Sequence, residues 1–247
     1  MRRSLLATSL LALAACGSPS EPQPGEGWDV FLLVGQSNMA GMGPLAGYTA
    51  PELGGRAWVL QGGAWKPAAE PLGEGGGVGP GVAFARRLLE LDPGRTVGLV
   101  PCARGGSTLR QWQPRDPAAL YRSCLALARA AQPKGRIAGV LVLQGESEGL
   151  GEGRADRWEQ MFGNVAASFR FDLRRLDLPV IVGQIGDVPR GREATAAAWA
   201  TVQREQEEAA ASLPNAALVR TAGLPTQDGI HFTTPAYLEV GRRFADA

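Results

Sequence analysis

The sequence predicts an α/β domain in which helices cover a parallel β-sheet. From Trp28 onward, short apolar runs alternate with longer amphipathic segments, as in βα units joined by right-handed crossovers. The short runs are almost continuously apolar, so we expect strands that are buried on both faces. With 247 residues, of which 45% are hydrophobic, the chain is long enough for one domain with a substantial core.

The elements follow from local pattern and punctuation. The apolar runs predict strands at 30–35, 96–102, 137–145, 179–186 and 216–221. Helical spacing predicts helices at 81–91, 118–131, 157–176 and 193–213. Pro93-Gly94 follows the first of these helices and Pro133 follows the second. A last helix begins at Thr233 or Thr234, with Pro235 in its first turn.

The first 20 residues are not expected to belong to the fold. Arg2 and Arg3 precede an apolar run that is too short for a comfortable membrane span, and small residues lead to Cys16. This pattern resembles a bacterial lipoprotein signal over 1–15, with Cys16 lipidated; an ordinary secretory signal is the alternative. Residues 16–27 are rich in Pro, Gly and Ser, which favours a flexible tether. We therefore expect an exported lipoprotein of the cell envelope that contacts the membrane only through this anchor.

Charge and histidine content narrow the possible partners. The formal net charge is +1 and no basic block stands out, so nucleic acid is not expected as a partner. The chain has one histidine, which argues against a multi-histidine metal site, and we expect no metal. The sequence leaves the oligomeric state open. It also leaves open whether Cys102 and Cys124 form a disulfide in an oxidising compartment or remain buried thiols.

Segments rich in small and polar residues follow four of the predicted strands. They are "GQSNMAG" (35–41), "ARGGSTLRQW" (103–112), "QGESEG" (144–149) and "DGIHF" (228–232). Because the carboxyl ends of parallel strands lie at one edge of a sheet, we expect the four segments to converge there.

Two of these segments suggest nucleophilic catalysis. Ser37 is the candidate nucleophile, although Met39 excludes the G-x-S-x-G motif. His231 is the only imidazole that could act as base, and Asp228 lies three residues before it, close enough to orient its ring. The alternatives are a loop serine that caps a helix and a surface histidine.

A serine mechanism also needs donors for the developing oxyanion. The candidates are the N–H groups of Ser37 and Gly106 and the side-chain amide of Gln144. Gly105-Gly106 could instead form only a turn, and Gln144 could be only a hydrogen-bonding residue at a strand end.

Together the four blocks resemble the SGNH hydrolases, and more narrowly carbohydrate esterase family 6 and the sialate O-acetylesterase-like group. The likeness spans about residues 29–245, so 28–247 is expected to be a single domain. It implies a flavodoxin-like three-layer α/β/α sandwich that removes acetyl groups from carbohydrate hydroxyls without a cofactor. It also implies that Ser37, His231 and Asp228 form the triad and that Ser37, Gly106 and Gln144 provide the oxyanion hole.

The sequence leaves the roles of other residues in the blocks open. Glu146 could hydrogen-bond neighbouring loops or orient His231, whereas Glu148, where the family usually has Asp, is expected to be a solvated charge. Candidate pocket residues are Gln36, Asn38, Arg104 and Trp112. The expected substrate is an acetylated carbohydrate. Two alternatives remain open: an esterase for longer acyl chains, and a non-catalytic surface lipoprotein that binds glycans. The Gly/Pro-rich segments 42–55 and 68–80 contain no motif that selects among substrates.

Overall fold

The computed structural model describes residues 27–247. The predicted signal sequence, the lipidation of Cys16 and all but the last residue of the predicted tether lie outside this range. Within 27–247, no helix combines the length and apolar character that crossing a membrane requires.

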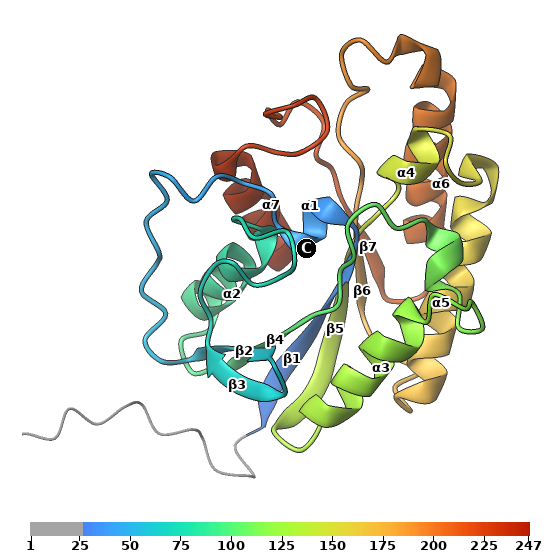
Figure 1. Ribbon diagram of the computed structural model, residues 1–247. Helices are drawn as coiled ribbons and strands as arrows, with labels where there is room; N and C mark the ends of the chain where they lie inside the picture. The colour runs from blue at the N-terminus through green and yellow to red at the C-terminus, as the bar shows by residue number, and fades with distance from the viewer. Residues whose placement is uncertain (1–26) are drawn as a thin grey trace, which may run out of the picture.

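A seven-stranded sheet forms the centre of the domain (Figure 1). Its order is β3-β2-β4-β1-β5-β6-β7, and every neighbouring pair is parallel except β2 and β3. The strands are β1 (Trp28–Gly35), β2 (Ala57–Gln61), β3 (Ala64–Pro67), β4 (Val97–Pro101), β5 (Gly135–Leu143), β6 (Val180–Gly183) and β7 (Ala216–Val219). The central strand β1 is hydrogen-bonded to β4 on one side and β5 on the other.

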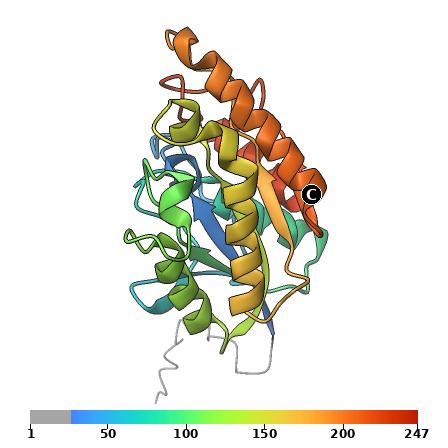
Figure 2. The same cartoon turned by 90° about the vertical axis from the view of Figure 1, so that its right-hand side faces the viewer.

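Helices cover both faces of the sheet (Figures 1 and 2). One face carries α2 (Pro80–Leu91) and α7 (Thr234–Asp246); the other carries α3 (Leu120–Ala131), α5 (Trp158–Asp172) and α6 (Ala196–Ser212). Successive side chains of β1 pack into the hydrophobic cores on opposite faces of the sheet. Val30 and Leu32 pack with α3, α5 and α6, whereas Phe31 and Leu33 pack with α2 and α7. This two-sided burial explains the unbroken apolar run and confirms the predicted three-layer α/β/α fold.

Each predicted strand and helix is present, with ends shifted by a few residues. The predicted helix 157–176 ends at Asp172, and the start of the predicted helix 193–213 is a 3-10 turn, Glu193–Thr195. The hairpin of β2 and β3 was not predicted. Its signal is Gly62-Gly63: both residues have positive φ angles, and Gln61 pairs with Ala64 across this two-residue turn.

The structure joins Cys102 and Cys124 in a disulfide, with their Cα atoms 5.2 Å apart. Cys102 directly follows β4, and Cys124 is buried in α3. Of the two alternatives left open by the sequence, the structure therefore has the disulfide. It ties the start of the loop after β4 to the helix layer.

We expect replacement of Cys124 by Ser to reduce the stability of the domain. A cross-link between residues 22 positions apart restricts the unfolded chain, so its loss should lower the free energy of unfolding by about 2–4 kcal/mol. Urea denaturation followed by circular dichroism measures this change. A reductant should shift the wild-type midpoint and leave that of the double variant Cys102→Ser/Cys124→Ser unchanged. Identical wild-type midpoints with and without reductant would contradict the prediction.

Candidate active site

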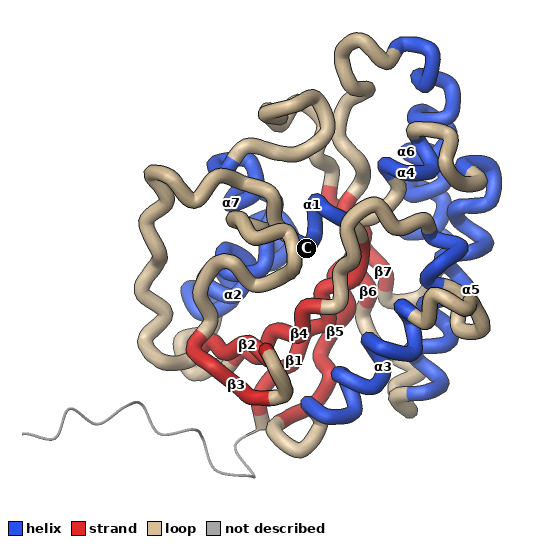
Figure 3. The backbone as a smooth tube through the Cα atoms, in the orientation of Figure 1, coloured by secondary structure: helices blue, strands red, loops and turns tan. Residues whose placement is uncertain are grey.

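Residues of all four predicted segments line one pocket at the carboxyl edge of the sheet. Two of the segments contain short helices, α1 (Ser37–Ala40) after β1 and α4 (Glu146–Gly149) after β5, which lie beyond these strand ends (Figure 3). Together with the loop after β4 and the segment before α7, they line a pocket of about 490 Å³. The lining residues are Gln36, Ser37, Ala40, Met42, Glu74, Gly75, Gly105, Gly106, Glu146, Ser147, Leu150, Glu152, Ile230 and His231.

Ser37, His231 and Asp228 form a hydrogen-bonded chain at this pocket. Ser37 Oγ lies 2.9 Å from His231 Nε2, although the two residues are 194 positions apart. His231 Nδ1 lies 2.6 Å from Asp228 Oδ2. The imidazole is thus held between a hydroxyl and a carboxylate, the arrangement in which Nε2 can accept the hydroxyl proton.

Asp228 also shapes the turn that carries the histidine. Its Oδ1 accepts hydrogen bonds from the Ile230 N–H at 3.0 Å and the His231 N–H at 2.7 Å. Burial alone would raise the pKa of Asp228, but the hydrogen bonds from His231 and Ile230 outweigh it and hold the pKa below its usual value. Asp228 therefore remains an ionised acceptor for the Nδ1 proton.

Ser37 and Gly106 both line this pocket, and each has a backbone N–H. Among the hydrogen bonds of residues 27–247, none is donated by the N–H of Ser37 or of Gly106. Gly106 is exposed and has a φ of +64°, a conformation that favours glycine. Both N–H groups are consequently available to a ligand oxygen.

The expectation for Gln144 requires correction. Its side chain is buried, and its Nε2 donates to Glu148 Oε2 at 2.6 Å and to the Ser107 carbonyl at 3.3 Å. Its Oε1 accepts the indole N–H of Trp158 at 2.8 Å. Because both amide hydrogens have protein acceptors, Gln144 supports the Ser107 backbone and does not offer a third oxyanion donor in this geometry.

Glu148 is likewise not the solvated charge that the sequence suggested. It is fully buried; Oε1 accepts the Leu109 N–H at 2.6 Å and Oε2 accepts the amide of Gln144. Burial raises its pKa above the usual value. The short helix α4 turns this side chain inward, a direction that the sequence of a strand-end loop does not reveal.

Asn38 links the Ser37 segment to the loop that carries His231. Its buried amide nitrogen donates to Glu146 Oε1 at 2.6 Å and to the Ile230 carbonyl at 3.1 Å. Its oxygen accepts the Phe232 N–H at 3.3 Å and the Tyr237 hydroxyl at 2.6 Å. All four hydrogen-bonding positions of the amide are thus used. Asn38, which directly follows Ser37, is therefore hydrogen-bonded to both residues that flank His231.

Glu146 supports Asn38 by accepting a hydrogen bond from its side-chain amide. It is 1% exposed, and burial raises the pKa of its carboxyl group above the usual value. Its second oxygen has no hydrogen-bond partner among residues 27–247. Of the two predicted roles, the bond to Asn38 corresponds to contact with a neighbouring loop; no hydrogen bond joins Glu146 to His231 in the described structure.

Three other candidates occupy different places. Gln36 lines the pocket, and its Oε1 lies 3.3 Å from the N–H of Gly145. The prediction that Trp112 lines the pocket is wrong, because its side chain is fully buried and its indole N–H donates to Ser107 Oγ at 3.0 Å. Arg104 is not among the lining residues either, but its guanidinium lies 2.5 Å from Glu74, which is one of them.

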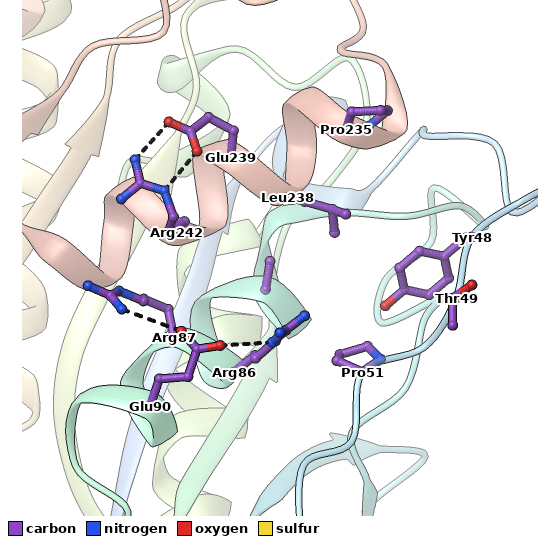
Figure 4. Close-up of a pocket in the computed structure, with 11 residues that line it drawn as sticks. Tyr48, Thr49, Pro51, Arg86, Arg87, Glu90, Pro235, Leu238, Glu239 and Arg242 are labelled. Atoms are coloured by element: carbon purple, nitrogen blue, oxygen red, sulfur yellow. Dashed lines mark hydrogen bonds and ion pairs between the residues drawn. The ribbon is translucent and has the colours of Figure 1, made fainter.

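A second pocket lies between α2, α7 and residues 48–51 (Figure 4). It is lined by charged residues that pair with one another, including Glu90 with Arg86 and Arg87, and Glu239 with Arg242. None of its lining residues is a serine, cysteine or histidine. We therefore assign the chemistry to the pocket that contains Ser37.

The described residues include one group of carboxylates close enough to share a cation: Glu159, Glu205 and Glu208. These groups already have protein partners. Ser212 donates to Glu159, and Arg204 pairs with Glu205 and Glu208. They are not among the residues of the candidate active site, and we assign them no metal-binding role.

Comparison with known proteins shows the family to which the chain belongs. Residues 27–247 match the family described as carbohydrate esterase, sialic acid-specific acetylesterase. A probable carbohydrate esterase of Arabidopsis thaliana is 31% identical over 88% of this chain and 89% of its own. Its X-ray structure has a TM-score of 0.77 at 29% identity and covers 88% of this chain and 96% of that one.

Two further structures support the fold. A carbohydrate acetylesterase from Xanthomonas citri has a TM-score of 0.69 and 25% identity, over 88% of this chain and 54% of that chain. A variant of an acetyl xylan esterase from Geobacillus stearothermophilus has a TM-score of 0.57 at 12% identity, over 90% of this chain and 95% of its own. The latter likeness concerns the fold alone, and the predicted SGNH hydrolase fold is confirmed.

An esterase with a three-layer α/β/α fold is the class that the fold and these matches define. This chain belongs to the carbohydrate esterase family of sialic acid-specific acetylesterases. Several pocket residues escaped the sequence analysis, among them Glu74, Leu150 and Glu152. Their only signal was a position in loops flanking the recognised blocks, which does not specify orientation.

We expect Asn38→Ala to destabilise the domain strongly. The substitution leaves Glu146, the Ile230 carbonyl and the Phe232 N–H without this partner, so the free energy of unfolding should fall by about 2–4 kcal/mol. Chemical denaturation measures the change. Asn164→Ala, at an exposed position of α5, provides the matched control and should change stability little. Equal stability of the two variants would show that the Asn38 network contributes nothing.

Proposed function

We propose that this protein is a serine esterase that removes O-acetyl groups from carbohydrates through an acetyl-enzyme. The observation that carries the proposal is the hydrogen-bonded chain from Ser37 through His231 to Asp228 at a solvent-open pocket. Membership of a carbohydrate esterase family supports the same chemistry. The name of the Xanthomonas citri relative, a carbohydrate acetylesterase, supports acetyl as the acyl group.

In the first half-reaction, Ser37 Oγ attacks the acetyl carbonyl carbon while His231 Nε2 takes the hydroxyl proton. The carbonyl oxygen becomes an oxyanion that accepts hydrogen bonds from the N–H groups of Ser37 and Gly106. Collapse of this intermediate breaks the ester bond, and the imidazolium returns its proton to the departing sugar oxygen. The products are a free carbohydrate hydroxyl and an acetyl group on Ser37.

Water completes the cycle. His231, neutral again, takes a proton from a water molecule as its oxygen attacks the acetyl-enzyme, and the same donors stabilise the second oxyanion. Collapse then releases acetate, and the proton on His231 returns to Ser37 Oγ. Asp228 stabilises the imidazolium in both halves because its carboxylate lies 2.6 Å from Nδ1.

Two alternatives predict different substrates. An esterase for longer acyl chains would prefer nitrophenyl octanoate to nitrophenyl acetate. A non-catalytic protein that binds glycans would bind without turnover, but such a protein needs no serine, histidine and carboxylate in hydrogen-bonding order. We favour the acetylesterase because the hydrogen-bonded triad supports turnover and the family membership supports carbohydrate acetyl esters.

We expect Ser37→Ala and His231→Ala each to reduce hydrolysis of nitrophenyl acetate to background, since one removes the attacking hydroxyl and the other removes the imidazole that accepts its proton. Acetate release from a panel of acetylated xylan, sialic acid and peptidoglycan would identify the carbohydrate. Ser168→Ala, on the outer part of α5, is the matched control and should retain full activity. Circular dichroism should be unchanged throughout. Wild-type activity in either the Ser37 or the His231 variant would rule out the mechanism.

The pH profile should have a single acidic limb. The mechanism needs a free lone pair on His231 Nε2 to accept the Ser37 proton, so activity should fall in acid. Hydrogen bonds hold the pKa of Asp228 below its usual value, so this carboxylate stays ionised to more acidic pH than a free aspartate. We expect kcat/KM for nitrophenyl acetate to fall about tenfold per pH unit on the acidic side. A profile that rises on acidification would contradict His231 as the base.

A further inference from the structure

The Gly-rich segment 73–79, which we call the glycine strap, packs against the chain that follows the nucleophile. Its backbone is hydrogen-bonded to residues 41 and 43: the Gly77 N–H donates to the Gly41 carbonyl at 3.1 Å, and Val78 and Gly43 exchange two bonds of 2.8 and 3.0 Å. Segment 68–80 revealed no motif as a sequence. Its glycines instead correspond to a docking contact beside the active site.

Glycine is required at this contact because the two backbones nearly touch. A Cβ atom on Gly75 would lie 2.0 Å from the Gly41 carbonyl oxygen, and one on Gly77 would lie 2.4 Å from that of Gly43. Neither distance is compatible with a side chain. The strap is therefore fixed against α1 and its following residues, and it carries one long polar side chain, Glu74.

Glu74 reaches the loop that contains Gly106. Its Oε1 accepts the Gly105 N–H at 2.5 Å, and its Oε2 accepts the guanidinium of Arg104, also at 2.5 Å. Both are short, charge-assisted bonds. Arg104 also balances the negative charge of Glu74, so the carboxylate can hold this loop without strongly opposing a nearby oxyanion.

The rest of the loop is held by other groups. Trp112 donates to Ser107 Oγ, Gln144 donates to the Ser107 carbonyl, and Glu148 accepts the Leu109 N–H. These bonds fix the buried end of the loop. Gly105 and Gly106 form its exposed tip, and within 27–247 the hydrogen bond to Glu74 is the only one that either residue's N–H makes.

We infer that Glu74 is a positioning residue, which fixes the Gly105–Gly106 tip so that the Gly106 N–H is aimed at the oxyanion. The inference rests on the proposed esterase function. A loosened donor spends less time in the orientation that the transition state needs, which lowers kcat more than it affects the binding of a neutral ester. Glu74 itself acts through Gly106 and does not take part in bond changes.

The test compares Glu74→Ala, Glu74→Gln and Glu90→Ala in the hydrolysis of nitrophenyl acetate. We expect Glu74→Ala to lower kcat by about tenfold or more while KM changes less than twofold. Glutamine retains Oε1 as an acceptor for Gly105, so Glu74→Gln should keep kcat within about threefold of wild type. Glu90 also pairs with arginines, but on α2 at the second pocket (Figure 4), and its alanine variant should match wild type.

Two results would overturn the inference: kcat of Glu74→Ala within twofold of wild type, or equal losses in the alanine and glutamine variants. Failure of the proposed function is separate, because it would appear as wild-type hydrolysis no faster than that of Ser37→Ala. In that event, amide hydrogen exchange of residues 103–108 decides the positioning role. Faster exchange in Glu74→Ala than in wild type and Glu90→Ala supports it, and equal exchange contradicts it.

Discussion

Parallel pairing of β1 with both β4 and β5 is the constraint on which the rest of the site depends. Hydrogen bonds on both sides fix the register of β1, so the position of Ser37 relative to the two neighbouring strand ends is set by the sheet. The loop with Gly106 follows one neighbour, and Glu146 follows the other. The carboxyl edge thus brings together Ser37, the exposed Gly106 N–H and the buried carboxyl group of Glu146 from three adjacent strands.

The polar groups beneath this edge form a connected network. Glu148, Gln144 and Ser107 link α4 to the loop after β4, while Glu146 and Asn38 link α4 to the segment before α7. Burying two carboxyl groups is costly, and burial accordingly raises the pKa of both. Glu148 has partners for both oxygens, whereas Glu146 has a partner for one. The network joins α1, α4, the loop after β4 and the segment before α7 into one hydrogen-bonded unit beneath the pocket.

The sequence predicted the fold well because its signals are periodic and local. Apolar runs and helix boundaries depend on neighbouring residues, and the convergence of strand ends follows from parallel topology. Side-chain direction does not. Glu148 and Trp112 point into the interior because α4 and the 3-10 turn Leu109–Trp112 rotate them inward. Gln144 was a candidate oxyanion donor because of its place at a strand end, and the family resemblance implied the same role, but its environment here directs the amide to Glu148. Glu74 was missed since its partners lie 30 and 31 positions away.

The single histidine shows how local and long-range order combine. Asp228 binds the ring and also the backbone N–H groups of Ile230 and His231, so the carboxylate and the imidazole are oriented within one short turn. Such a turn can form from its own residues. Its alignment with Ser37, however, depends on the rest of the fold, because His231 and Ser37 are 194 residues apart. Asn38 supplies that alignment: it follows Ser37 directly and holds Ile230 and Phe232, the residues on either side of the imidazole. The distance between Ser37 Oγ and the imidazole is therefore set by the neighbours of both residues, through the buried side-chain amide of Asn38.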